Sequence, residues 1–187
     1  MKLLLTYLSL IITLGLSQDT RSTIFNTGTP ETDDGYLISG ENSIADRFSI
    51  TSDYAMEAFR VTMTMESESA TMIISIHNDL DNIPGDVLGS WDVELTTTGL
   101  REYLIYTFQD CILFDADENY WISVKAADET SSGTWVYSPA DFYTYSTSND
   151  QQNTWETTQG NAGSTKIYAE AFYAAPDLLG DINSDDT

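Results

Sequence analysis

The only histidine, His77, and the only cysteine, Cys111, limit the chemistry that this sequence can carry. A serine–histidine–acid triad would have to use His77, but no Gly-x-Ser-x-Gly motif is present to expose a nucleophilic serine. One histidine and one cysteine also cannot make an ordinary zinc site. We therefore interpret His77 as a surface residue at the end of a strand, and Cys111 as a small buried apolar residue.

Carboxylates offer a second kind of chemistry, because the chain contains 30 acidic residues. Glycoside hydrolysis needs two carboxyl groups that face one cleft about 5–10 Å apart. Most of the acidic residues fall in predicted turns, where chance pairs are expected. We therefore rank hydrolysis below an interaction function and below carbohydrate binding, and we predict that the chain is not an enzyme.

Aromatic residues in the polar segment 139–163 could form a carbohydrate site. Sugar rings stack on exposed aromatic side chains, while amides and carboxylates bond to their hydroxyl groups. Tyr143, Tyr145 and Trp155 lie in this segment, with Asn-Asp-Gln at 149–151 between them. We predict glycan contacts on these three aromatic residues.

The charge balance bears on partners. Seven basic residues against 30 acidic ones give a formal net charge of −23, which repels nucleic acids and anionic membranes and attracts cations such as calcium. Two turns, 79–86 and 115–119, contain spaced oxygen ligands, but the same residue types are typical of solvated turns. We expect both turns to be solvated.

Short strands separated by polar turns must position these residues. In the stretch 70–88, β-branched residues alternate so that Met72, Ile74 and Ile76 share one face, which predicts a strand. Turn formers crowd 78–85, so we expect the chain to reverse at Pro84-Gly85. The next strand is expected to begin by residue 88.

The same pattern recurs along the chain. Strands are expected at 22–28, 36–38, 43–51, 59–66, 87–95, 100–108, 120–126, 134–138 and 166–173. Asp46 interrupts an apolar face and is expected half-buried or at an edge, 54–60 can be helix or strand, and Trp91, Trp121 and Trp135 are expected in the core. Closely spaced strands without an amphipathic helix predict an all-β antiparallel β-sandwich, jelly-roll-like.

The N-terminus predicts export. Met1-Lys2 precedes an apolar run of about 14 residues, short of the about 20 that span a bilayer, and small residues precede Gln18. We assign residues 1–17 to a signal peptide, 18–174 to the sandwich and 175–187 to an acidic linker and the start of a docking segment. A single cysteine leaves no internal disulfide.

Three short blocks resemble a known family of exported domains: Ile76-His77-Asn78-Asp79 with Ile83-Pro84-Gly85, the run 117–122, and Gly133-Thr134-Trp135. Together they resemble the bacterial choice-of-anchor class of exported β-sandwich domains, over roughly residues 43–172. The resemblance implies a surface or secreted module beside an anchoring signal. It implies no catalytic residues.

The end of the chain, Gly180-Asp181-Ile182-Asn183-Ser184-Asp185, is similar to the opening of a dockerin-type, EF-hand-like calcium loop. The resemblance implies oxygen ligands for calcium from Asp181, Asn183 and Asp185. Position 6 is Asp186 instead of glycine, and the sequence stops before the acidic residue at position 12, so we expect a fragment of a longer product.

These observations predict a secreted or cell-surface, non-catalytic β-sandwich interaction module attached to a truncated calcium-binding docking segment. Its expected partners are an extracellular glycan, or a protein that binds through the C-terminal segment. The alternative is a carbohydrate-binding accessory module of an extracellular polysaccharide-degrading enzyme.

Overall fold

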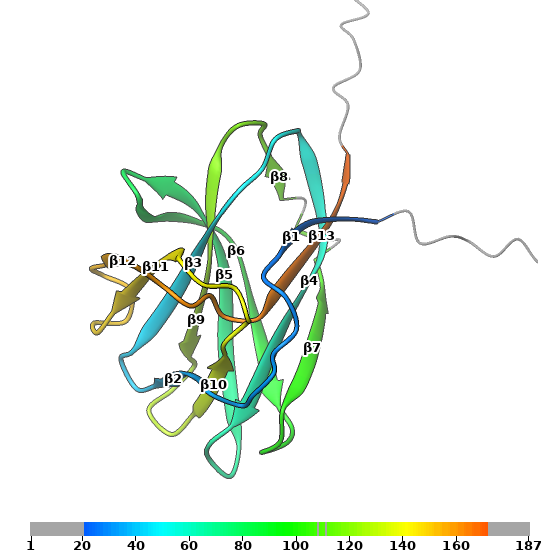
Figure 1. Cartoon of the computed structure of the whole chain (residues 1–187). Coiled ribbons are helices and arrows are strands. Elements are labelled where there is room, and N and C mark those ends of the chain that lie inside the picture. The colour runs from blue at the N-terminus through cyan, green and yellow to red at the C-terminus, as the bar shows by residue number, and fades with distance from the viewer. Residues whose placement is uncertain (1–20, 108, 111, 172–187) are drawn as a thin grey trace, which may run out of the picture.

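The computed structural model describes residues 21–107, 109–110 and 112–171 (Figure 1). The predictions for the signal peptide, for Cys111 and for Asp181, Asn183 and Asp185 lie outside these residues. The described residues form strands and no helix. The strands are β1 (Ser22–Asn26), β2 (Gly35–Ser39), β3 (Ser43–Ser49), β4 (Tyr54–Met65), β5 (Ala70–Leu80), β6 (Ile83–Leu95), β7 (Arg101–Tyr106), β8 (Leu113–Phe114), β9 (Asn119–Ala126), β10 (Ser132–Val136), β11 (Tyr143–Ser148), β12 (Glu156–Gly160) and β13 (Thr165–Ala171).

Two antiparallel sheets pack face to face. One has the order β1-β13-β4-β10-β2, with β7 and β8 also paired to β4; the other has the order β12-β11-β3-β9-β5-β6. Figure 1 shows β11 and β12 at one side of the molecule and β7 at the other. The chain changes sheet at most of its connections. The predicted jelly-roll-like sandwich is therefore confirmed.

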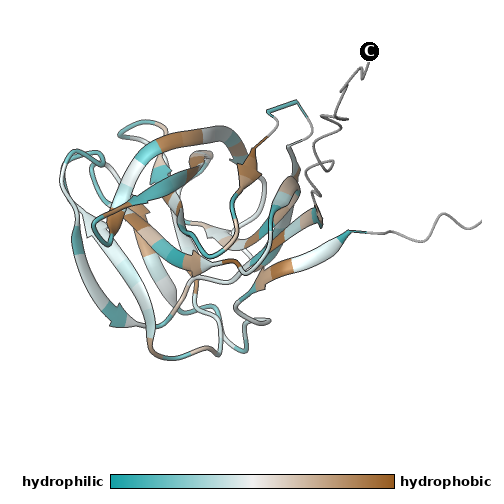
Figure 2. Ribbon diagram, turned by 90° about the horizontal axis from the view of Figure 1, so that it is seen from above, coloured by the Kyte–Doolittle hydropathy of each residue, from teal (hydrophilic) through white to brown (hydrophobic). Residues whose placement is uncertain are grey.

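The core lies between the sheets and follows the alternation of the sequence. Met72, Ile74 and Ile76 of β5 have no exposed surface, as predicted, and the inward residues of β4 meet them from the opposite sheet. Figure 2 shows hydrophobic and hydrophilic residues alternating along the strands. Residues two apart point to the same side of a strand, so this pattern gives each sheet one apolar face.

The hairpin between β5 and β6 turns earlier than predicted. Its two turn residues are Asp81 and Asn82, with φ of 53° and 68°. Two consecutive left-handed residues fit a two-residue hairpin, whose twist matches that of the strands, and Asp and Asn tolerate this conformation. Pro84 and Gly85, expected at the reversal, lie inside β6.

Asp46 is not at an edge. It lies in β3, between β9 and β11, and is fully buried. The segment 54–60, whose sequence is compatible with helix or strand, is the first half of β4. Burial of Trp121 and Trp135 is confirmed, but Trp121 lies on the outer side of its sheet, with the register partners Arg47 and His77.

The segment 139–163 contains a second hairpin that the sequence reasoning missed. Strands β11 and β12 pair with each other, and β11 also pairs with β3. Strand β11 consists of Ser, Thr and Tyr, and β12 consists of Glu, Thr, Gln and Gly, so no apolar periodicity marks either strand. This hairpin extends the six-stranded sheet and carries the loop 149–155 over its outer face.

Candidate functional site

A buried polar pair lies on the outer face of the six-stranded sheet. His77 of β5 is 2% exposed, so its prediction as a surface residue was wrong. Its Nδ1 lies 3.1 Å from the carbonyl oxygen of Gly85, and its Nε2 lies 2.8 Å from Oγ of Ser123. Because a carbonyl only accepts, Nδ1 carries the proton, and the Ser123 hydroxyl donates to Nε2.

Burial lowers the pKa of His77 below its usual value, and the nearby positive charge of Lys125 lowers it further. The imidazole is therefore neutral at pH 7. Its two nitrogens are both used in hydrogen bonds, which hold the ring in place.

The loop 149–155 covers this pair. Gln152 donates from Nε2 to Oγ of Ser123 at 3.1 Å, and the ring of Trp155 meets that of His77 edge-on, with centroids 6.4 Å apart. Gln151 and Gln152 both have left-handed backbones, with φ of 60° and 75°. Strain of this kind persists only where the surroundings enforce it.

Asp150 enforces the shape of the loop. Its Oδ1 accepts from the Ser148 hydroxyl at 2.8 Å and from the Thr154 N–H at 2.9 Å, and its Oδ2 accepts from the Thr154 hydroxyl at 2.7 Å. The bonds from Thr154, and then that from Ser148, lower the pKa of the carboxyl. Asp150 is thus a structural residue of the loop.

A groove of about 430 Å³ runs between this loop and the tip of the β5–β6 hairpin. One wall is the loop, from Gln151 to Trp155. The opposite wall includes Leu80 and Val87, which are 57% and 55% exposed, and His77 also lines the groove. We call it the Trp155 groove. A bond from the Thr157 hydroxyl to the carbonyl of Asn82, 2.9 Å long, ties the hairpin tip to β12.

The serine–histidine pair lacks the access that nucleophilic catalysis needs. Ser123 is fully buried in β9, a strand paired on both sides with β3 and β5, and Gln152 covers its hydroxyl. Backbone N–H groups in such a ladder are already bonded and do not offer an oxyanion hole. The His77–Ser123 pair instead anchors the loop residue Gln152 and so supports one wall of the groove.

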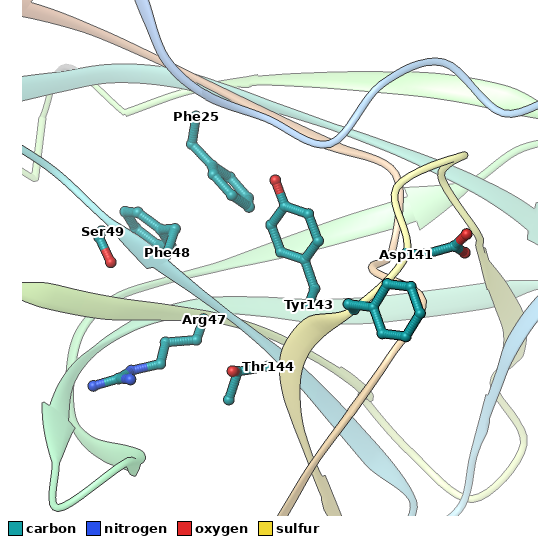
Figure 3. Close-up of a pocket in the computed structure, with 8 residues that line it drawn as sticks. Phe25, Arg47, Phe48, Ser49, Asp141, Tyr143 and Thr144 are labelled. Carbon is teal, nitrogen blue, oxygen red and sulfur yellow. The ribbon is translucent and has the colours of Figure 1, made fainter.

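A second hollow, of about 360 Å³, opens beside the start of β11 (Figure 3). Figure 3 shows Phe25, Phe48 and Tyr143 close together, with Arg47 on one side and Asp141 on the other. Phe25 stacks on Phe48 with centroids 5.1 Å apart and meets Tyr143 edge-on at 6.0 Å. Phe142 also lines this hollow, which we call the Phe142 pocket.

The structure separates the three predicted glycan residues. Tyr143 lines the Phe142 pocket and Trp155 lines the Trp155 groove. Tyr145 packs inward against Tyr36, with ring centroids 5.1 Å apart. Phe142, which the sequence reasoning passed over, is 82% exposed. The alternation of the sequence could have predicted the exposure of Phe142. Tyr143 and Tyr145 are two residues apart and share one side of a strand, so the neighbouring Phe142 must point to another side.

The sequence matches no protein-family model and no curated protein. The geometry of the two hollows is therefore the basis for a proposed function. Within residues 21–171, positions 108 and 111 aside, no helix is suited to crossing a membrane.

Acidic turns in the described residues do not gather into a metal site. No group of three or more His, Cys, Asp or Glu residues there could hold an ion. Asp79, one of the candidates, instead accepts from Arg47 Nε at 2.9 Å and from Trp121 Nε1 at 2.7 Å. The calcium prediction for Asp181, Asn183 and Asp185 concerns residues outside this part.

Asp46 is a buried acid in the interior. Its Oδ2 accepts from the N–H of Gly163 at 2.6 Å, while its Oδ1 has no hydrogen-bond partner among the described residues. Burial raises the pKa of Asp46 well above its usual value. The pKa of the neighbouring Tyr36 is raised too, first by burial and then by Asp46. Burial therefore favours the neutral form of the Asp46 carboxyl group over its ionised form.

Proposed function

We propose that this chain is an exported, non-catalytic β-sandwich module that binds a neutral carbohydrate in the Trp155 groove. The observation that carries the proposal is the lining of the groove. It combines an indole with the side chains of Gln151, Gln152 and Asn153, which can both donate and accept hydrogen bonds. This combination suits a sugar, whose ring has apolar faces and whose edge carries hydroxyl groups.

Charge supports a neutral ligand. The protein has 30 acidic residues, yet no Asp, Glu, Lys or Arg is among the described residues that line the groove. His77, the one titratable side chain in it, is neutral at pH 7 because burial lowers its pKa. An ionic ligand would find no opposite charge there.

Rigidity also supports binding. The hydrogen bonds of Asp150 fix the loop, and the bond from Thr157 fixes the hairpin tip, so both walls are held before a ligand arrives. Preorganised walls reduce the entropy lost on binding. The enclosure of Ser123 supports a binding role over a catalytic one.

Export and a calcium-dependent attachment are part of the same proposal. The apolar N-terminal run supports secretion to the extracellular space or cell surface. The alternation of Asp181, Asn183 and Asp185 supports a docking segment that takes calcium, through which a protein partner would bind.

Calorimetric titration with neutral oligosaccharides of glucose, xylose and mannose tests the binding proposal. One of them should bind, and Trp155→Ala should weaken that binding at least about tenfold, equivalent to about 1.4 kcal/mol, because the stacking surface is lost. Asp150→Ala should also weaken it, since the loop loses its support.

Leu104→Ala is the matched control. Leu104 is 40% exposed on β7, in the other sheet, so its loss removes apolar surface but leaves the groove intact. The proposal fails if none of the sugars binds, or if Trp155→Ala binds as tightly as the control while its thermal melt shows that it is folded.

A further inference from the structure

The Phe142 pocket has features that the carbohydrate proposal does not use. We infer that it binds a cationic side chain, lysine or arginine, presented by a partner protein. It shares no lining residue with the Trp155 groove, and the inference does not depend on what that groove binds.

The first observation is Phe142 itself. Its side chain is 82% exposed and its backbone φ is 65°. A bulky residue rarely adopts the left-handed conformation, and exposing a phenyl ring forgoes the gain from burial. Both features disfavour the unbound state, and both are explained if the ring makes its contacts with a partner.

The second observation is the chemistry around the ring. The half-buried Tyr143 adds a second aromatic ring, and Asp141, next to Phe142, adds a carboxylate. Phe25 and Phe48 also line the pocket, but they are buried and stack on each other. Aromatic faces attract cations that lie within about 6 Å of the ring centre, and a carboxylate strengthens that attraction. The hollow of about 360 Å³ has room for an ammonium or guanidinium group on its methylene stem.

Arg47 does not oppose this occupant. Its Nε lies 2.9 Å from Oδ1 of Asp79, so its charge is already matched, and its guanidinium lies 5.9 Å from the ring centre of Trp121. Figure 3 shows Arg47 on the side of the pocket away from Asp141. The half formed by Asp141 and the aromatic rings is therefore free for a second cation.

The third observation is the charge of the whole chain. A net charge of −23 draws cationic partners toward the surface and raises their association rate. A general field gives no local specificity. The aromatic rings would supply it, at one place on an otherwise acidic surface.

Titration of the full chain with Nα-acetyl-arginine amide, followed by NMR, tests the inference. The uncharged isostere Nα-acetyl-citrulline amide is the reference probe. We expect saturable shifts at residues 141–144 with arginine and weaker ones with citrulline. No saturable shift there, or equal binding of the two probes, would overturn the inference.

Substitutions at Phe142 separate cation binding from general apolar contact without changing the net charge. Phe142→Leu keeps an apolar side chain but removes the aromatic face, so arginine should bind roughly two- to fivefold more weakly. Phe142→Trp should bind at least as well as the natural residue. If Phe142→Leu retains full affinity, the pocket is an apolar contact and the inference is wrong.

Two further variants complete the design. Asp141→Asn should weaken binding of arginine and leave binding of citrulline unchanged. Trp155→Ala should leave both unchanged, so failure of the carbohydrate proposal and failure of this inference give different results.

Discussion

At the scale of single residues, Asp46 makes the stability of the folded state depend on pH. A carboxyl group with a raised pKa stays protonated in the folded state while the same group in the unfolded chain ionises above about pH 4. Its contribution to stability is therefore fully present below about pH 4. It is lost as the pH rises toward the folded-state pKa.

We expect Asp46→Asn to make the protein more stable than the natural chain at pH 7 but not at about pH 3. Asparagine cannot ionise, and its oxygen can still accept from the Gly163 N–H. Urea unfolding at both pH values measures the difference.

Asp128→Asn is the opposite control for that experiment. Hydrogen bonds from Thr130 and then Ser131 lower the pKa of Asp128, so its carboxylate stabilises the folded state above about pH 4 and this contribution is lost as the pH falls. Asp128→Asn should therefore not stabilise the protein at pH 7. If Asp46→Asn, compared with the natural chain, is less stable at pH 7 than at pH 3, the pKa of Asp46 is not raised by folding.

At the scale of elements, the backbone of Gly163, just before β13, packs directly against the indole of Trp135 in β10. Gly163 forms a bridge with Tyr137, and a Cβ atom added to it would overlap the indole of Trp135, which is fully buried. The absence of a side chain lets the chain enter β13 against the core. This contact fixes the position of β13 relative to β10.

We expect Gly163→Ala to lower the free energy of unfolding by about 1–3 kcal/mol, because the core must shift to admit the methyl group. Chemical denaturation measures the change. Gly99→Ala is the matched control, since its added Cβ would lie 3.7 Å from the nearest atom, Oγ1 of Thr97. Equal stabilities of the two variants would mean that the core has room at Gly163.

How much the sequence could predict differs from element to element. The alternation of Met72, Ile74 and Ile76 identified β5, because a strand with one apolar face repeats every two residues. The strands β11 and β12 escaped prediction because their pairing with β3, and not an apolar pattern, holds them in the sheet. The sequence of a strand does not indicate which distant strand it will pair with.

The candidate sites were harder to predict than the strands. Trp155 was identified from its polar surroundings, but the hairpin tip opposite it is some seventy residues earlier in the chain, and only the fold brings the two together. His77 is likewise covered by residues far away in the sequence, because the loop that contains Gln152 and Trp155 folds over it. Periodicity describes each strand alone and does not say which loop will cover it.

At the scale of the whole molecule, the charge of −23 works against the compact state. Raising potassium chloride from about 0.01 M to about 0.15 M shortens the screening length from about 30 Å to about 8 Å. We expect the Tm to rise, by roughly 2–4 °C for each kcal/mol of repulsion removed. Scanning calorimetry with a chelator present measures this.

Calcium at the same ionic strength separates screening from specific binding. If Asp181, Asn183 and Asp185 hold the ion, calorimetry should detect saturable binding that is lost when all three are replaced by alanine. Binding that survives these replacements would move the calcium site elsewhere. An unchanged Tm in potassium chloride would contradict the repulsion argument.

Both walls of the Trp155 groove belong to connections between strands: the tip of the β5–β6 hairpin and the loop 149–155. The apolar core lies between the sheets and makes no use of either connection. Insertions, deletions and substitutions in these two connections can therefore alter the lining of the groove while the sandwich continues to fold. The proposed binding site could thus diversify among related chains without a cost in stability, because its walls and the core are built from separate residues.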